Sequence, residues 1–155
     1  MATKVELQEA RTETGRSVAQ IASYRDLLAW QKAMLVVETC YRVTRAFPRS
    51  ERFGLTLQIR RAAVSVPANI AEGKSRRTTG SYLQHLCIAA GSHAELETLV
   101  ELAKRLALMS PEDETSLISQ TDAVGRLLTA LIRSVRLKLP ERGRSPRASA
   151  GGISS

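Results

Sequence analysis

Aromatic residues are scarce in this chain, and cysteine is rarer still. Of 155 residues, 4% are Phe, Trp or Tyr, against 43% hydrophobic residues in all, and there are two cysteines. The strands of a β-sandwich favour Val, Ile, Tyr, Phe and Trp, so an aromatic-poor, Leu- and Ala-rich interior favours helices instead. At this length the chain is expected to form one domain with a sizeable core.

Sequence motifs of catalysis are also missing. The chain has no Gly-rich phosphate-binding motif and no nucleophile elbow around a serine. His85 and His93 lie eight residues apart, which is too far for a pair of metal ligands at i and i+4. Cys87 is two residues from His85, and such residues point about 200° apart on a helix. We therefore expect no enzymatic activity, no cofactor and no metal site.

Long apolar runs are absent as well. The first residues carry charges throughout and lack the apolar stretch of a signal peptide, and no window approaches the 18 apolar residues of a membrane span. Cys40 and Cys87 fall within apolar helical patterns and are expected to be buried, reduced thiols. These features predict a cytoplasmic protein without membrane contact.

Positive charge is abundant. The chain has 23 Lys and Arg against 15 Asp and Glu, a net charge of +8, and residues 24–139 alone carry a net +6. A basic domain of this kind is a hint of a polyanionic partner such as nucleic acid. The alternative, a protein that is basic without consequence, stays open at this point.

Four segments have the apolar spacing of three and four residues that indicates helices. The first follows Ser23, an expected N-cap with Asp26 three residues later, and ends before Pro48. The second opens at Ser50 and Glu51 and ends near Gly73. The third is expected over residues 81–109, with a small-residue patch at Ala89–Ser92 that suggests close approach of another backbone.

The fourth helix has the clearest start. Ser110 is an expected N-cap, Pro111 suits the first helical position, and three carboxylates follow in the first turn. Four helices with short connections predict an all-α, antiparallel up-down-up-down four-helix bundle over residues 23–139. Residues 1–22 are predicted to be a flexible arm, and residues 140–155 a disordered, low-complexity tail.

The segment from Leu55 to Gly73 mixes apolar and polar residues in an unusual way. One apolar stripe contains Leu57, Val64, Ala68 and Ala71, and a second contains Ile59, Ala63, Val66 and Ile70. A helix that is apolar on two sides is expected to be sandwiched between neighbours. Pro67 should kink this helix or end it early, and Ser65 or Asn69 could satisfy the backbone that it frees.

A row of polar residues runs between the two stripes. It contains Arg61, Ser65, Asn69 and Glu72, and Ser92 and Glu95 on the next helix can face it. We interpret these six residues as a structural polar network between two helices, because buried polar groups need partners. A site that grips a small polar ligand is the alternative.

A cationic loop follows this helix. Lys74, Arg76 and Arg77 lie among Gly, Ser and Thr, and Arg60 adds a charge on the helix before them. These four residues are the candidate nucleic-acid contacts, and a solvated loop is the alternative. The loop has no interleaved aromatic residues, so binding would be electrostatic and dependent on salt.

The chain also resembles a known family. The stretches YRDLLAWQKA, FPRSERFGLTLQIRRAAVSVPANIAEG and SYLQHLCIAAGSHAELETLVELAKRL are similar to those of the four-helix-bundle family named after 23S ribosomal RNA intervening sequences. The accessory protein of diversity-generating retroelements in bacteria is a relative. The similarity spans about residues 24–136 and includes the specific motif SVPANIAEG.

This resemblance implies a homo-oligomeric ring, a homopentamer of antiparallel bundles. It also implies partners among RNA, DNA and a nucleic-acid enzyme such as a reverse transcriptase. The polar positions of the family fall here on the six residues of the predicted network. His93 departs from the pattern, because an apolar residue is expected there, and the tail from Pro140 lies outside it.

Two hypotheses follow for function. The first is a non-enzymatic basic adaptor that contacts RNA or DNA as an oligomer. The second is a structural or protein–protein interaction module whose charge is incidental, motivated by apolar helix faces wider than a lone bundle hides. Reversing Arg76 and Arg77 to Glu would separate them.

Overall fold

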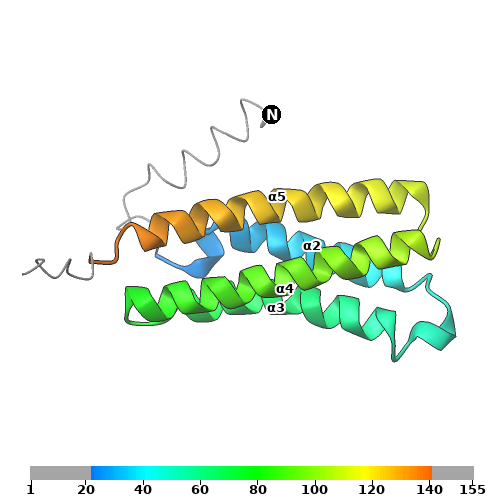
Figure 1. Ribbon diagram of the computed structural model, residues 1–155, viewed down its shortest axis with the longest axis horizontal. Coiled ribbons are helices and arrows are strands. Elements are labelled where there is room, and N and C mark those ends of the chain that lie inside the picture. Colours follow the sequence, from blue (N-terminus) through cyan, green and yellow to red (C-terminus); the bar gives the residue numbers. More distant parts are fainter. Residues whose placement is uncertain (1–21, 141–155) are drawn as a thin grey trace, which may run out of the picture.

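Four long helices form the part of the chain that the structure describes. The computed structural model describes residues 22–140, and the helices are α2 (Leu28–Thr44), α3 (Leu55–Lys74), α4 (Thr79–Arg105) and α5 (Pro111–Arg136) (Figure 1). Two 3-10 helices, η2 (Tyr24–Asp26) and η3 (Arg49–Glu51), precede α2 and α3. The described residues contain no strand, as expected for an all-α chain. The predicted arm and tail, residues 1–22 and 140–155, lie outside this part except for Ala22 and Pro140.

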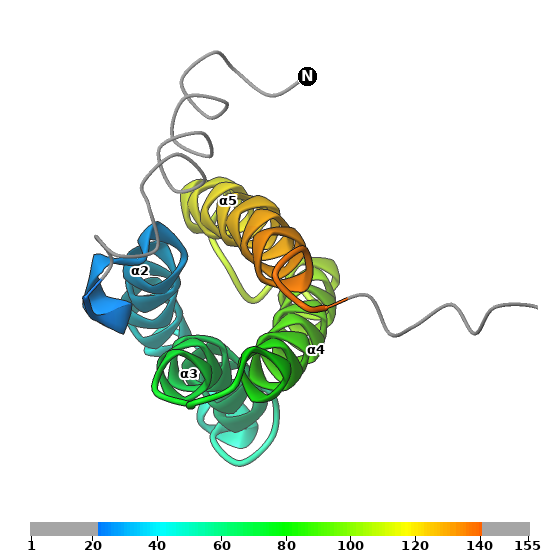
Figure 2. The same ribbon diagram turned by 90° about the vertical axis from the view of Figure 1, so that its left-hand side faces the viewer.

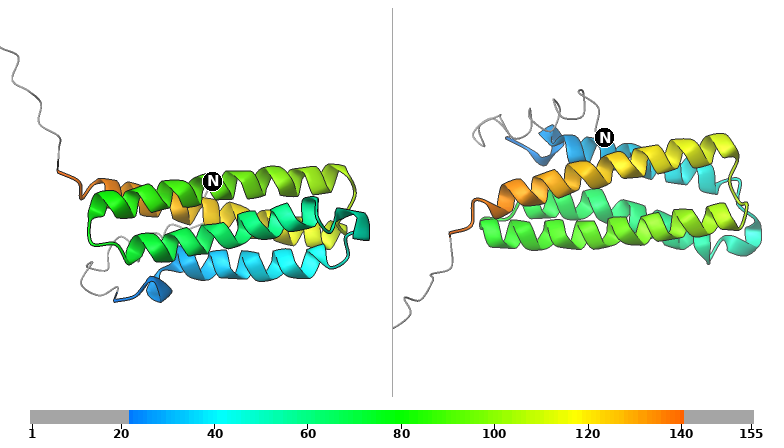
Figure 3. Two further views of the ribbon diagram at one scale, coloured as in Figure 1. Left: turned by 90° about the horizontal axis from the view of Figure 1, so that it is seen from below. Right: turned by 45° about the horizontal axis from the view of Figure 1, so that its top comes forward.

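The helices run alternately up and down and surround one core. Seen along the bundle, each helix packs against the next one in the chain, and α5 closes the circle by packing against α2 (Figures 2 and 3). The loops are short, so the α3–α4 loop, the start of α2 and the end of α5 meet at one end of the bundle. The predicted four-helix bundle is therefore confirmed, whereas the ring remains a prediction.

The core is aliphatic, as the composition suggested. Its largest fully buried side chains come from all four helices and from the residue before α2. Burying one Leu, Ile or Val side chain stabilises the fold by roughly 1.5–3 kcal/mol. These residues are Leu27, Ile59, Ile70, Leu86, Leu96, Leu117, Leu128, Val124 and Cys40. Burial raises the pKa of the Cys40 thiol to about 12, so the thiol stays protonated.

The caps predicted at Ser23 and Ser110 are confirmed, but the start predicted at Ser50 and Glu51 is wrong, because these residues lie in η3 and α3 begins only at Leu55. Ser23 and Asp26 form a reciprocal capping box, although the element that it opens is η2 and α2 starts only at Leu28. The Ser110 hydroxyl accepts a hydrogen bond from the Asp113 amide, with Pro111 at the first position of α5. Thr78 caps α4 in the same way through the Ser81 amide, so α4 begins earlier than predicted.

Pro67 does not end α3. The helix continues to Lys74, and Pro67 itself is buried against its neighbours. The expected early end is therefore wrong, because packing of the apolar face outweighs one lost backbone hydrogen bond. Pro67 has no N–H, so the carbonyl of Ala63 lacks its usual helical donor. The side-chain amide of Asn69 does not replace that donor, because it donates to the carbonyl of Ser65 instead.

Three expectations about burial are wrong. Cys87 is exposed, because it lies one residue past the buried Leu86 and so turns outward. In α3 only one apolar stripe is covered within the chain, since Leu57 and Val64 each remain 42% exposed. Gly91 has no atom near the position of a Cβ, so the small-residue patch receives no neighbouring backbone from this chain.

The helices approach most closely at other glycines. A Cβ at Gly73 would lie 2.8 Å from the Cβ of His85 and 2.9 Å from Tyr82, so the end of α3 can pack on α4 only without a side chain there. α3 ends at Lys74, one residue after Gly73, so the end predicted near Gly73 is confirmed. None of the helices between residues 22 and 140 combines the length and apolar character needed to cross a membrane.

A candidate nucleic-acid interface at one end of the bundle

Basic residues gather where the α3–α4 loop, the start of α2 and the end of α5 meet. Lys74 is the last residue of α3, Arg136 is the last residue of α5, and Lys138 follows two residues later. The loop Ser75–Thr78 lies at the same end of the bundle (Figure 1). We call this surface the basic end. Its cations are Arg25, Lys74, Arg76, Arg77, Arg136 and Lys138, against the two carboxylates of Asp26 and Glu72.

Most of these cations are not neutralised by carboxylates. Within the described residues, only Arg76 of this group forms an ion pair, with Glu72 four residues before it. Arg77, Arg136 and Lys138 are exposed to solvent. The basic end therefore presents a net positive surface.

At the opposite end of the bundle some cations are paired with carboxylates, whereas Arg45, Arg49 and Arg52 form no ion pair among the described residues. Lys104 lies 2.8 Å from Glu114, and Arg105 lies 2.7 Å from Glu101. These contacts lower the pKa of the Glu101 carboxyl and raise that of the Lys104 ammonium, because each hydrogen bond stabilises the charged form. The two ends differ in their charge balance. The opposite end has nearly as many carboxylates as cations, namely Glu51, Glu101, Glu112, Asp113 and Glu114 with Arg42, Arg45, Arg49, Arg52, Lys104 and Arg105, whereas the basic end has six cations and two carboxylates.

The candidate contact Arg60 is not at the basic end. It lies in the first half of α3, fourteen positions before Lys74, and therefore roughly 21 Å away along the helix. Its Nε donates to the Thr44 hydroxyl at 2.9 Å, and its guanidinium lies 4.5 Å from the centre of the Tyr41 ring. Arg60 ties α2 to α3, so the four predicted contacts do not form one patch.

The polar row on α3 is partly joined by hydrogen bonds to α4. The hydroxyls of Ser65 and Ser92 are 2.7 Å apart, and the Asn69 amide donates to Ser65. Glu72, at the end of the row, accepts from Arg76 of the loop. Four of the six residues predicted as a network therefore lie along one seam.

Arg61 and Glu95 lie apart from that seam. Both are exposed, and among the described residues neither forms a hydrogen bond or ion pair with the other four. They belong to the outer surface of α3 and α4, beside the uncovered stripe of Leu57, Val64 and Ala68.

His85 is the residue that the sequence did not point to. Its Nε2 accepts from Arg76 Nε at 3.2 Å, so Nδ1 carries the proton and faces Asn69 Oδ1 at 3.4 Å. A directional series of hydrogen bonds thus runs from Arg76 through His85 and Asn69 to Ser65. Because Ser65 of α3 pairs with Ser92 of the antiparallel α4, His85 lies beside Glu72. That register is visible only in the structure.

The described residues contain no group of three or more His, Cys, Asp or Glu side chains placed to hold a metal ion. The chemistry of the basic end is therefore that of hydrogen-bond donors and positive charge. Such a surface can bind phosphate oxygens.

Comparisons with known proteins agree with this architecture. The family model described as 23S rRNA-intervening sequence protein matches residues 25–130. The fold is similar to that of a protein of unknown function from the S23 ribosomal protein family of Bacteroides thetaiotaomicron, with 22% identity and a TM-score of 0.62, over 68% of this chain and 99% of that one. At that identity the likeness shows the fold alone. No curated protein matches the chain.

Proposed function

The chain belongs to the 23S rRNA-intervening sequence protein family, and from this premise we propose that it is a non-enzymatic adaptor that binds RNA or DNA through its basic end. The observation that carries the proposal is the uneven charge. At the opposite end carboxylates nearly equal the cations in number, whereas the basic end has six cations and two carboxylates, and its Lys74, Arg77, Arg136 and Lys138 have no carboxylate partner among the described residues.

Binding at this surface would depend on charge rather than on base recognition. Phosphate contacts by Lys and Arg release counterions, so affinity falls steeply with salt, with a slope of roughly −0.9 per phosphate neutralised on duplex DNA. Stacking of bases needs exposed aromatic rings. The most exposed aromatic residue in the described part, Phe53, follows η3 at the opposite end.

Assembly into a homo-oligomer belongs to the same proposal. Leu57 and Val64 on α3 and Ile88 and Leu102 on α4 are each between 42% and 47% exposed, on two helices that pack side by side. Covering such a face with further copies would bury apolar area that the single chain leaves in water. A ring of five copies would present five basic ends together, and avidity would strengthen a weak contact.

Charge reversal at each end of the bundle tests the nucleic-acid part. The variant Lys74→Glu with Arg77→Glu changes the basic end, and Arg49→Glu with Arg52→Glu makes the same charge change at the opposite end. We expect the first variant to lose retention of a structured RNA or a DNA duplex at about 50 mM salt, and the second to keep most of it. Equal losses in both variants would refute a localised interface.

A second function is favoured by the uncovered apolar stripe. The chain would then be a structural or protein–protein interaction module with no role in binding nucleic acid. A nucleic-acid enzyme such as a reverse transcriptase is a candidate protein partner under either function. Light scattering and RNA binding separate the two. The module is supported by a stable oligomer that binds neither RNA nor DNA and that keeps its biological function when Arg76→Glu and Arg77→Glu are introduced.

A further inference from the structure

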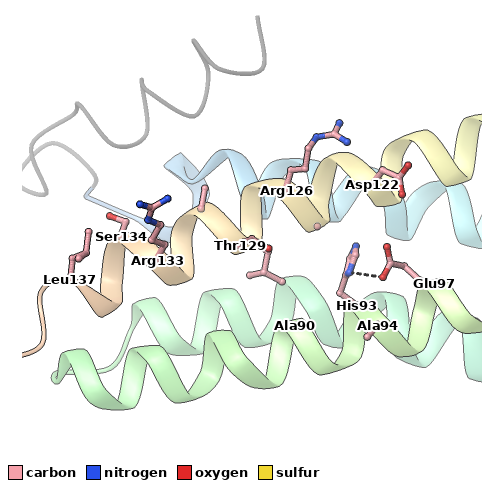
Figure 4. A pocket seen from close by; sticks show the side chains of 13 residues that line it. Ala90, His93, Ala94, Glu97, Asp122, Arg126, Thr129, Arg133, Ser134 and Leu137 are labelled. Carbon is pink, nitrogen blue, oxygen red and sulfur yellow. Dashed lines mark ion pairs between the residues drawn. The ribbon is translucent and has the colours of Figure 1, made fainter. Parts of the chain in front are cut away.

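A groove runs along the side of the bundle between α4 and α5. Its volume is about 1000 Å³. Figure 4 shows His93 and Glu97 rising from α4 on one side, with Thr129 reaching from α5 toward α4 on the other. The groove extends along α5 as far as Leu137 and so reaches the basic end, but none of the six cations that define that end lines it.

Small residues keep the groove open. Ala90 and Ala94 on α4 and Gly125 and Ala130 on α5 line it, where larger side chains would fill the space between the helices. Leu128 and Leu137 add apolar surface. The lining is thus largely apolar, with charged groups at separate positions along its length.

His93 and Glu97 form one of those positions, and together they can accept hydrogen bonds. His93 is 7% exposed, and its Nε2 lies 2.8 Å from the carbonyl oxygen of Thr121, which can only accept, so Nε2 carries the proton. In the neutral ring Nδ1 is then an acceptor, and it faces a second acceptor, Glu97 Oε2, at 3.5 Å. Two acceptors facing each other suit a donor that reaches both, such as an ammonium or guanidinium group.

A cation stands further along the groove. Arg133 lines it eight positions after Gly125, which lies against His93, and eight residues of α-helix span about 12 Å. Arg133 is exposed and forms no ion pair among the described residues. Asp122 and Arg126 line the groove near His93 and Glu97 as well. The groove therefore has acceptors around His93 and Glu97, and the guanidinium of Arg133 lies about two helical turns away.

This spacing matches an occupant of helical form. Two turns of a helix span about 11 Å, close to the distance between the two charged positions. Residues seven or eight apart lie on the same face of a helix. A segment with a basic residue and an acidic residue at that spacing would meet both charged positions at once.

We propose that the α4–α5 groove is a docking site for an amphipathic helix of a partner protein, which places a Lys or Arg against His93 and Glu97 and an acidic residue against Arg133. Between the two charges, a small apolar face packs on Ala90 and Ala130. This mode, a helix laid in a groove, takes its specificity from anchors at such intervals. It is independent of the nucleic-acid contact proposed for the basic end.

The test uses a fluorescein-labelled helical peptide of sixteen residues with an Ala-rich face. One version carries Lys and Glu seven residues apart on that face, one carries Lys at both positions, and one carries Gln at both. Fluorescence anisotropy with the full chain measures the affinity. We expect the Lys/Glu peptide to bind roughly fivefold more tightly than the other two, as two charge pairs in partly exposed sites allow.

Variants of the protein localise the binding. Ala94→Trp fills the groove at an exposed position and should abolish binding, whereas Ala46→Trp, exposed after α2, should not. Arg133→Glu should reverse the preference, so that the Lys/Lys peptide binds best. Arg136→Glu makes the same charge change outside the groove and should leave the preference as it was.

Three outcomes would overturn the proposal. One is equal binding of all three peptides, and another is Lys/Glu binding that survives Ala94→Trp. The third is a fall in particle mass by light scattering in the Ala94→Trp variant, because it would mean that a second copy of the chain covers the groove. Reversal of preference in Arg133→Glu supports the proposal even if Ala94→Trp is unstable.

Discussion

The imidazole of His93 occupies the space in which a side chain at Gly125 would begin. A Cβ at Gly125 would lie 2.8 Å from His93 Cε1 and 3.3 Å from Nε2. Because Nε2 is held by the Thr121 carbonyl at 2.8 Å, the ring cannot move aside without losing a buried hydrogen bond. The glycine therefore lets α5 pack on the histidine of α4.

Substituting Gly125 should reveal this contact. Gly125→Ala gains about 1 kcal/mol of helix propensity but displaces a hydrogen-bonded ring, so we expect a net loss of about 1 kcal/mol in the free energy of unfolding. Gly91→Ala is the matched control, because nothing lies near its Cβ position, and it should stabilise by about 0.5–1 kcal/mol. Urea unfolding measures both, and the same gain in the two variants would contradict the argument.

The hydrogen bonds between α3 and α4 should act together. Asn69 donates to Ser65 and faces His85, so Asn69→Ala should destabilise the fold by about 1–2 kcal/mol. His85→Ala should cost less once Asn69 is gone, and a double-mutant cycle should give a coupling of about 0.5–1 kcal/mol. Additive effects in the cycle would show that the two side chains are energetically independent.

Acid should weaken the start of α5. The Arg42 guanidinium, 2.6 Å from the Asp113 carboxylate, lowers the pKa of that carboxyl, with a smaller contribution from Ser110. A carboxyl whose folded pKa is lowered contributes stability that is complete above its unfolded pKa and is lost as the pH falls through the folded value. We therefore expect Asp113→Asn to reduce the loss of stability between about pH 5 and pH 2.

The size of that effect is set by exposure. Arg42 and Asp113 are partly solvated, so the pair contributes on the order of 0.2–1 kcal/mol. Glu112→Gln removes a neighbouring charge that has no contact with Arg42 among the described residues, and serves as the control. Thermal unfolding at a series of pH values gives the comparison, and identical pH profiles for both variants would speak against the Arg42 contact.

The two thiols should differ in reactivity. Cys87 is exposed, whereas Cys40 is buried with its pKa raised to about 12, and only a thiolate attacks a disulfide reagent. At about pH 8 we expect one thiol per folded chain to react with Ellman's reagent and the second only on unfolding. Cys87→Ser should leave none reactive in the folded chain, and rapid labelling of that variant would be contrary to the buried position of Cys40.

Features set by near neighbours in the chain were predictable. The caps at Ser23 and Ser110 depend on side chains two or three residues away, and the structure has both. The four-helix fold also followed from spacing, because periodic apolar residues define one buried face on each helix.

Features set by helix packing were not predictable. Cys87 and Leu57 lie within apolar patterns, yet only the phase of each helix against its neighbours decides which apolar residues turn outward. His85 joined the polar seam for the same reason, since its distance from Asn69 and Arg76 depends on the α3–α4 register. The early end of α3 predicted at Pro67 was wrong for a similar reason. Proline ends an isolated helix, but the buried face of α3 packs on its neighbours and the helix continues.

The order of the helices around the bundle has a consequence for how quickly the chain folds. Each helix packs on the next one along the sequence through loops as short as Ser75–Thr78, and among the four helices of the described residues α2 and α5 meet from opposite ends of the sequence. Most contacts therefore close small loops of chain, which costs little entropy before the contacts form. Bundles with such local contacts reach the native state in roughly microseconds to milliseconds, so the unfolded chain exposes its apolar residues only briefly.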